Sequence, residues 1–143
     1  MPSTSDGLRI PARLAQEIIA HAREDTPNEC CGVMAGKDGT IHEVYRTTNI
    51  DHSPVKYTID PQGMAQAFQA ADKAGHDVLG FYHSHTRTEA YPSVTDTRLA
   101  PPSDLFDYHY VIVSLQSAEK PSVRCFRIVD RKALEMTVEI THG

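Results

Sequence analysis

Two stretches of the chain carry apolar residues at the three-four spacing of an amphipathic helix. The first begins after Pro11 and ends before Pro27, and the second lies between Asp60-Pro61, which favours a helix start, and Gly75. Their apolar positions are Leu14, Ala15, Ile18, Ile19 and Ala22 in the first stretch and Met64, Phe68 and Ala71 in the second. We predict a helix over each stretch and a short third helix over 93–100, which two prolines end.

The remaining apolar runs are short and predict strands. The predicted strands are 31–35, 41–47, 55–59, 78–82, 108–115, 123–129 and 134–140, the last as an edge strand. Helices and strands in this order favour a sandwich of the α/β or α+β class with a mixed sheet. A length of 143 residues predicts a single domain over 1–143, in which residues 1–7 form a frayed terminus.

Charge and composition narrow the class of partner. The formal net charge is -5 and no run of Lys and Arg exceeds two residues, which argues against nucleic acid because phosphate binding needs a clustered cationic surface. The longest aliphatic stretch is a few residues around Val111–Val113, which argues against a membrane partner. Residues 1–20 lack the basic start and apolar core of a secretory signal, so we expect a cytoplasmic protein.

Two of the eight histidines stand at the end of the most apolar predicted strand, in the run Phe81-Tyr82-His83-Ser84-His85. Side chains two positions apart on a strand point to the same side, so His83 and His85 can present two imidazoles to one point, while Ser84 faces the opposite way. Two imidazoles suit Zn²⁺, but a catalytic zinc site normally has three protein ligands and one open position. Without further support, such a pair is more often a core or surface feature than a metal site.

That support comes from the run Ser93-Val94-Thr95-Asp96, which begins eight residues beyond His85. A Ser at a helix N-cap with an acidic residue three positions later resembles a capping box. The same helix start turns Asp96 back toward the strand end, where its carboxylate would complete a His-His-Asp set beside the Ser93 hydroxyl. Hydrolysis also needs a base, and Glu29, in the run Pro27-Asn28-Glu29-Cys30-Cys31-Gly32, is the candidate.

Together, Glu29, His83-x-His85 and, after seven residues, Ser93-x-x-Asp96 resemble the motif of the JAMM (MPN+) metalloproteases, E…H-x-H-x₇-S-x-x-D. The run 82–93 further resembles the small bacterial JAMM hydrolases that act on ubiquitin-like sulfur-carrier proteins, above all those that release cysteine in a cysteine-biosynthesis pathway. The resemblance implies a cytidine-deaminase-like α/β sandwich, in which helices flank a mixed sheet.

The resemblance also implies a role for each of these five residues. His83, His85 and Asp96 would bind Zn²⁺ and leave the fourth position to water. Glu29 would take the proton of the water and return it to the leaving amine, and Ser93 would donate a hydrogen bond to the tetrahedral oxyanion. The implied partner is a ubiquitin-like sulfur carrier with a Gly-Gly C-terminus, from which the enzyme removes a cysteine or a short peptide.

Several alternatives stay open. The competing functions are an isopeptidase that removes ubiquitin-like proteins from lysine and a non-catalytic MPN scaffold, although scaffolds typically lose motif residues that this chain retains. Arg87 is either an ordinary solvated side chain or the group that binds the terminal carboxylate of a released amino acid. Segments 49–56 and 86–92 are expected to flank a groove for an extended tail, and Cys30 and Cys31 to be buried residues rather than nucleophiles. The carrier, the leaving group and the formation of a homodimer are also open.

Overall fold

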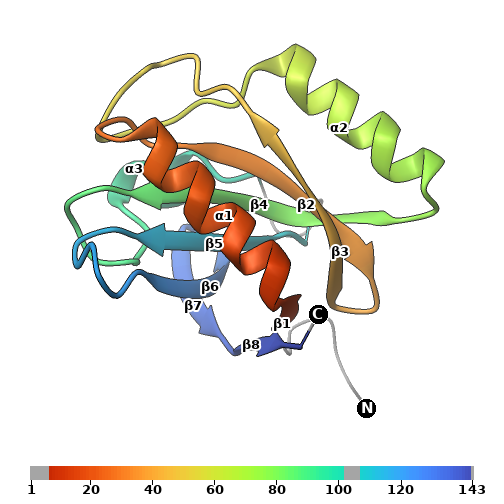
Figure 1. Ribbon diagram of the computed structural model, residues 1–143. Coiled ribbons are helices and arrows are strands. Elements are labelled where there is room, and N and C mark those ends of the chain that lie inside the picture. The colour runs from red at the N-terminus through yellow and green to blue at the C-terminus, as the bar shows by residue number, and fades with distance from the viewer. Residues whose placement is uncertain (1–6, 102–106, 143) are drawn as a thin grey trace.

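The computed structural model describes residues 7–101 and 107–142, and these form a mixed sheet flanked by helices (Figure 1). The strands are β1 (Leu8–Pro11), β2 (Cys31–Lys37), β3 (Thr40–Thr47), β4 (Asp77–His85), β5 (His109–Ser114), β6 (Ser122–Val129), β7 (Lys132–Met136) and β8 (Val138–Thr141). The helices are α1 (Ala12–Asp25), α2 (Pro61–Lys73) and α3 (Val94–Leu99). The predicted frayed terminus lies outside the described residues, apart from Gly7.

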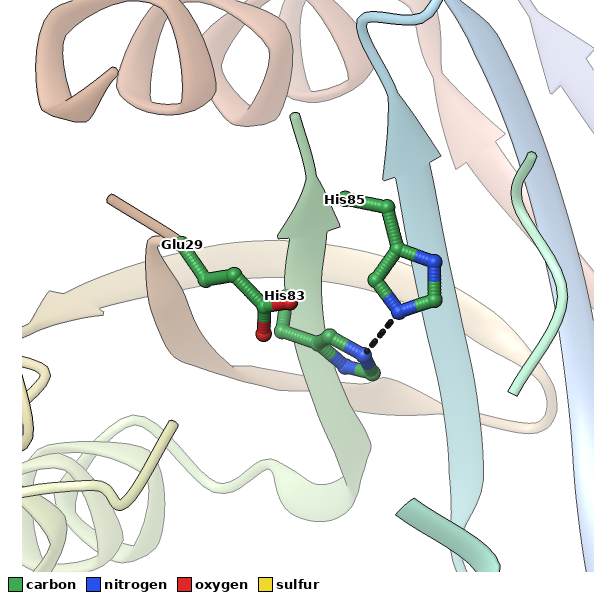
Figure 2. A group of neighbouring side chains, drawn as sticks. All are labelled: Glu29, His83 and His85. Atoms are coloured by element: carbon green, nitrogen blue, oxygen red, sulfur yellow. Dashed lines mark hydrogen bonds between the residues drawn. The ribbon is translucent and has the colours of Figure 1, made fainter. Parts of the chain in front are cut away.

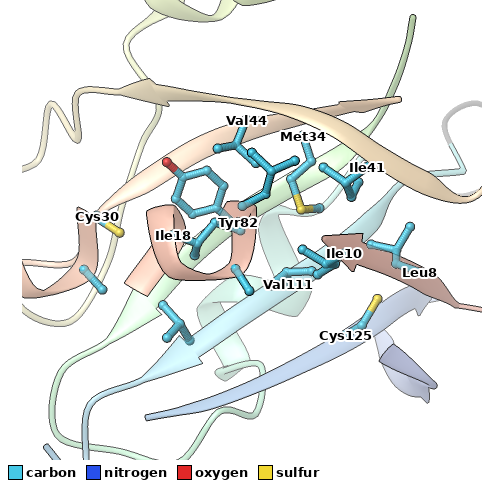
Figure 3. Close-up of a cluster of buried hydrophobic side chains, with 14 residues drawn as sticks. Leu8, Ile10, Ile18, Cys30, Met34, Ile41, Val44, Tyr82, Val111 and Cys125 are labelled. Atoms are coloured by element: carbon cyan, nitrogen blue, oxygen red, sulfur yellow. The ribbon is translucent and has the colours of Figure 1, made fainter. Parts of the chain in front are cut away.

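The eight strands form one sheet in the order β7-β6-β5-β4-β2-β3-β1-β8, with β1–β3, β1–β8 and β4–β5 as parallel pairs. A helix covers each face of its centre. Ile18 of α1 lies in one buried cluster with Tyr82 (Figure 3). Ala67 of α2 lies in a second cluster with Phe81. Because Phe81 and Tyr82 are neighbours on β4, both faces of this strand are buried, which explains its unbroken apolar sequence. The predicted α/β sandwich is confirmed.

The C-terminal segment differs from its prediction as one edge strand. Residues 134–140 belong to two strands, β7 and β8, which lie at opposite ends of the sheet order although Thr137 alone separates them. The sheet therefore curls until its two edges are joined by one residue, and the Thr137 carbonyl accepts the N–H of Leu8 at 3.1 Å. The alternation of apolar residues continues across the bend, so the pattern gave no sign of it.

The segment between β3 and α2 is also not the predicted strand 55–59. Residues 48–60 form a loop that is closed by an isolated bridge between Asn49 and Ile59. The predicted helices agree with α1, α2 and α3 within a few residues. In the part of the chain that the structure describes, none of the helices is both long and apolar enough to cross a membrane.

Candidate metal centre

The two histidines of β4 lie on the sheet face that α2 covers, as the two-residue period of a strand predicts. His83 and His85 are only 2% and 5% exposed, and their Nε2 atoms are 3.3 Å apart (Figure 2). Ser84, between them, faces the opposite side, where its Oγ accepts the N–H of Cys30 at 2.8 Å. The strand end therefore directs both imidazoles toward one point.

The N-terminus of α3 brings a carboxylate to the same point. Ser93 caps the helix: its Oγ accepts the N–H of Asp96 at 3.0 Å, and its own N–H donates to Asp96 Oδ2 at 2.8 Å. This capping box holds Oδ2 at 3.1 Å from His83 Nε2 and 3.2 Å from His85 Nε2. The structural interpretation and the metal-ligand interpretation of Asp96 are therefore compatible, because one geometry serves both.

The spacing of these three atoms tests whether they fit a zinc ion. Ligand distances of about 2.0–2.1 Å place neighbouring atoms of a tetrahedral site about 3.3–3.4 Å apart. The observed separations of 3.1, 3.2 and 3.3 Å are close to that spacing. In addition, His85 Nδ1 donates to the carbonyl oxygen of Glu89 at 2.8 Å, so in the neutral ring Nε2 keeps the lone pair that a metal requires. The three residues fit Zn²⁺.

The protonation states of the three groups follow from burial and from their mutual hydrogen bonds. Burial opposes ionisation of Asp96, but hydrogen bonds with the two imidazoles outweigh it and hold the pKa of the carboxyl well below its usual range. Burial lowers the pKa of His83. Burial also acts to lower the pKa of His85, but the hydrogen bonds to Asp96 and to the Glu89 carbonyl raise it overall. A divalent cation needs Asp96 ionised and both imidazoles neutral, so cation binding at this site competes with protonation of His85.

Glu29 reaches the site from the neighbouring strand. β2 runs antiparallel to β4 with Cys31 opposite His83, so the residue two positions before Cys31 extends this register toward His85 and faces the same side. One side-chain oxygen of Glu29 lies within 4.8 Å of the ligand nitrogens of both histidines, and Figure 2 shows the carboxyl directed toward them. Glu29 could itself be a third ligand, but Asp96 lies closer to both imidazoles, which favours Glu29 as the base.

The surroundings of Glu29 leave its carboxyl able to accept a proton. The residue is 4% exposed, and its Oε1 has no hydrogen-bond partner among the described residues. Burial raises the pKa of this carboxyl to about 8, against the smaller opposing effect of His85. A carboxyl with a pKa near the working pH can both accept and return a proton.

Three features of the site are not predicted by the sequence. The ring of Tyr57 stacks on His83 with a centroid distance of 4.3 Å, and Asn49 connects the 48–60 loop to Glu29. A cavity of about 460 Å³ opens beside Asp96. Its lining is mostly aromatic and aliphatic and includes Tyr57, Met64, Phe68, Phe81, Leu99 and Tyr110. The pair Ser53-Pro54, which stands just before the predicted strand 55–59 and is typical of a turn, was the one signal in the sequence for this loop.

The other candidate residues lie around this centre. Arg87 is exposed and makes no hydrogen bond or ion pair with any of the described residues, so its substrate role stays a prediction. The segments 49–56 and 86–92 contribute no residue to the lining of the apolar cavity. Cys30 and Cys31 are buried on opposite faces of the sheet, and burial raises the pKa of their thiols to about 12 and about 11. Both thiols are therefore protonated near neutral pH, unlike a reactive thiolate.

The fold and the site together define a class of protein, the JAMM-type hydrolases. In this class a mixed sheet is flanked by helices, two histidines and a carboxylate meet at one strand end, and a glutamate lies beside them. The family model described as prokaryotic homologs of the JAB domain matches residues 11–129, so the chain belongs to this family. The resemblance predicted from the five motif residues is thereby confirmed.

Relatives with names support the same class. The chain is 39% identical over 135 residues to the CysO-cysteine peptidase of Mycobacterium tuberculosis, which covers 93% of this chain and 90% of the relative. It is 38% identical over 104 residues to the desampylase of Haloferax volcanii, with 68% and 75% covered. A solution structure of a Desulfitobacterium hafniense protein matches with a TM-score of 0.86 and 33% identity, covering 95% and 94% of the two chains. The prediction of an enzyme of the peptidase type is confirmed.

Proposed function

We propose that this chain is a zinc hydrolase that removes a C-terminal cysteine, or a short peptide, from a ubiquitin-like sulfur-carrier protein. The observation that carries the proposal is the convergence of His83, His85 and Asp96 within 3.1–3.3 Å of one another. Beside them lies the Glu29 carboxyl, whose Oε1 has no hydrogen-bond partner among the described residues. The reaction would serve the biosynthesis of cysteine or of another sulfur metabolite in the cytoplasm.

The chain's own residues supply proton transfer and oxyanion binding. When bound, a zinc ion supplies Lewis acidity to the scissile carbonyl and acidity to a water. Glu29 accepts the proton of the attacking water and returns it to the nitrogen of the leaving amine. Ser93 Oγ accepts only the N–H of Asp96 among the described residues, so its hydroxyl hydrogen is available to donate to the oxyanion.

The surroundings of the site support an extended tail as the substrate. The apolar cavity lies between α2, α3 and residues 57–59 and borders Asp96 directly. A cavity of about 460 Å³ accepts bulky apolar side chains upstream of the cleaved bond, whereas two glycines at that bond let the backbone approach a crowded metal centre. The M. tuberculosis relative, whose name specifies a CysO-cysteine substrate, supports cysteine as the released group.

An isopeptidase that removes a ubiquitin-like protein from lysine is the second candidate. The specific observation in its favour is the similarity to the H. volcanii desampylase, at 38% identity. A non-catalytic scaffold is not favoured, because Glu29, Ser93 and the three ligand residues are all present and lie together.

A metal-content experiment tests the site. His83→Ala removes a ligand, so we expect zinc per chain to fall from about one to near zero together with turnover. Glu29→Gln is the matched control: it removes the base without removing a ligand, so zinc stays bound while turnover falls about a hundred-fold. Full zinc occupancy in His83→Ala, measured by elemental analysis, would contradict the ligand assignment.

A second experiment tests the substrate. The probes are a ubiquitin-fold sulfur carrier of the same organism extended after its Gly-Gly by one cysteine, and the same carrier linked through Gly-Gly to a lysine side chain. Intact-mass measurement follows the loss of cysteine or of the lysine partner over time. We expect faster release of cysteine; preference for the lysine conjugate would favour the isopeptidase instead.

A further inference from the structure

Asn49 lies at the start of the 48–60 loop, 4% exposed, and its side chain makes four hydrogen bonds. Nδ2 donates to the carbonyl oxygens of Glu29 and Lys56, each at 3.0 Å. Oδ1 accepts the N–H groups of Asp51 at 3.0 Å and of Thr58 at 3.1 Å. An amide side chain offers two donor hydrogens and two acceptor lone pairs, so every bonding position of Asn49 is used.

One of these bonds, together with a main-chain bond to Ser53, holds the Glu29 main chain in place. Glu29 precedes β2, so its main-chain groups have no partner in the sheet ladder. Its carbonyl instead accepts from Asn49, and its N–H donates to the carbonyl of Ser53 at 2.9 Å. Both main-chain polar groups of Glu29 are therefore bonded to the 48–60 loop, and Asn49 is the side chain that joins Glu29 to both arms of this loop.

On its other side, Glu29 is connected to the ligand strand. The N–H of Cys30 donates to Ser84 Oγ at 2.8 Å, and Ser84 stands between the two histidines. The loop also reaches the ligands: the groups that Asn49 binds at Lys56 and Thr58 flank Tyr57, whose ring stacks on His83 at 4.3 Å and 24°. Asn49 is thus bonded both to the Glu29 main chain and to the part of the loop that packs on the metal site, beside the bond from the Glu29 N–H to the Ser53 carbonyl.

We propose that Asn49 is a positioning residue for the reaction, which places the Glu29 carboxyl through the main-chain carbonyl of Glu29. The inference rests on the proposed function, because it takes Glu29 as the base. Misplacement of a catalytic group by about 1 Å can cost about a hundred-fold in rate, although the bulk of the fold is unaffected. Asn49 touches none of the three ligand residues among its four bonded groups, so its loss should spare the metal.

The test is a double-mutant cycle with the zinc-loaded protein and the carrier extended by cysteine as substrate. Asn49→Ala should lower kcat about tenfold or more, leave KM within about twofold and leave zinc per chain unchanged. In a Glu29→Gln background the same substitution should change kcat by less than about twofold, because the carboxylate that Asn49 positions is already gone. A residue that merely stabilised the fold would lower both backgrounds alike.

Two further variants separate positioning from loop closure. Asp51→Ala removes the hydrogen bond that Thr58 Oγ1 donates to Asp51 at 2.6 Å within the same loop, but leaves the Asn49–Glu29 bond, so kcat should stay within about twofold. If Asn49→Ala does not fold, as judged by its melting temperature, Asn49→Asp replaces it. The aspartate keeps the two acceptor bonds, from the N–H groups of Asp51 and Thr58, and loses the two donor bonds, to the carbonyls of Glu29 and Lys56, so kcat should fall as for alanine.

Three outcomes would overturn the assignment of Asn49. One is an equal fall of kcat in both backgrounds, a second is a change in KM alone, and a third is an Asp51→Ala variant as slow as Asn49→Ala. Failure of the proposed function has a different signature: Glu29→Gln alone would then turn over at nearly the wild-type rate, or the wild-type protein would leave the cysteine adduct intact. In that case both proposals fall together.

Discussion

The buried carboxyl of Glu29 should make the metal-free protein less stable as the pH rises. Glu29 is 4% exposed, and burial raises its pKa from 4.5 to about 8. Replacing it by the isosteric Gln removes the ionisation but keeps the shape of the side chain. We therefore expect Glu29→Gln to lose activity and, when metal-free, to be more stable than the wild-type protein above neutral pH.

The sign and size follow from proton linkage. Below pH 4.5 Glu29 is protonated in the folded and in the unfolded chain, so the group does not change the free energy of unfolding. Between pH 4.5 and about 8 the unfolded chain gives up the proton while the folded chain retains it. Over this interval the wild-type free energy of unfolding falls by up to about 1.4 kcal/mol per pH unit, which reaches about 3 kcal/mol at pH 7. Because the pKa of about 8 already includes the opposing effect of His85, we expect the variant to be more stable by about 3 kcal/mol or less at pH 7.

The assay is urea unfolding of protein dialysed against a chelator, at several pH values from 5 to 8. The quantity that matters is the difference between variant and wild type, because the other titrating groups are common to both. Glu119→Gln, at an exposed position, is the control for removing one carboxylate from the surface. A difference that is flat across this range, or a wild type that is the more stable protein at pH 8, would refute the account of Glu29 as a destabilised buried acid.

Three further predictions concern single positions. Ser93→Ala should lower turnover about a hundred-fold through loss of the oxyanion donor, and should lower stability by up to about 2 kcal/mol through loss of the helix cap. Kinetics and melting are therefore measured on the same sample, and Ser93→Thr is the variant that should restore both. Gly32→Ala should lower the free energy of unfolding, measured in urea, by about 1–3 kcal/mol, because its Cβ would lie 2.2 Å from the Tyr82 ring. Gly63→Ala in α2 is the control: its Cβ would have no neighbour closer than 3.6 Å, so the change should be neutral or stabilising. Arg87→Ala should raise KM for the cysteine adduct and leave zinc content unchanged; an unaltered KM would return this exposed arginine to the solvated surface.

The sequence predicts the ligand half of the site because its geometry is local. The two-residue period of β4 places His83 and His85 on one face and Ser84 on the other, and the capping box of α3 orients Asp96. Each of these relations spans no more than four residues. They therefore hold whatever the rest of the fold does, and a pattern of residue types is enough to reveal them.

The sequence is silent where the geometry depends on distant partners. The bend at Thr137 exists because β8 pairs with β1, whose four residues near the N-terminus are too short to give a pattern of their own. Residues 55–59 have the composition of a strand, but their one bridge within the described residues is with Asn49, two positions beyond the end of β3. The segment therefore closes a loop through a single bridge at Ile59.

Glu29 shows how the two kinds of information combine. Its residue type marks it as a base, but only the antiparallel register that sets Cys31 opposite His83 gives it the same face as the histidines. That register aligns the face of the side chain and leaves its main chain outside the ladder, so a second segment must supply the missing hydrogen bonds. The 48–60 loop does so through Asn49 and Ser53. Because β2 begins after Glu29, the main chain of Glu29 requires a hydrogen-bond partner outside the sheet. Which residue becomes that partner depends on how the loop returns across the sheet. An asparagine in a polar loop therefore cannot be recognised as this partner from a single sequence.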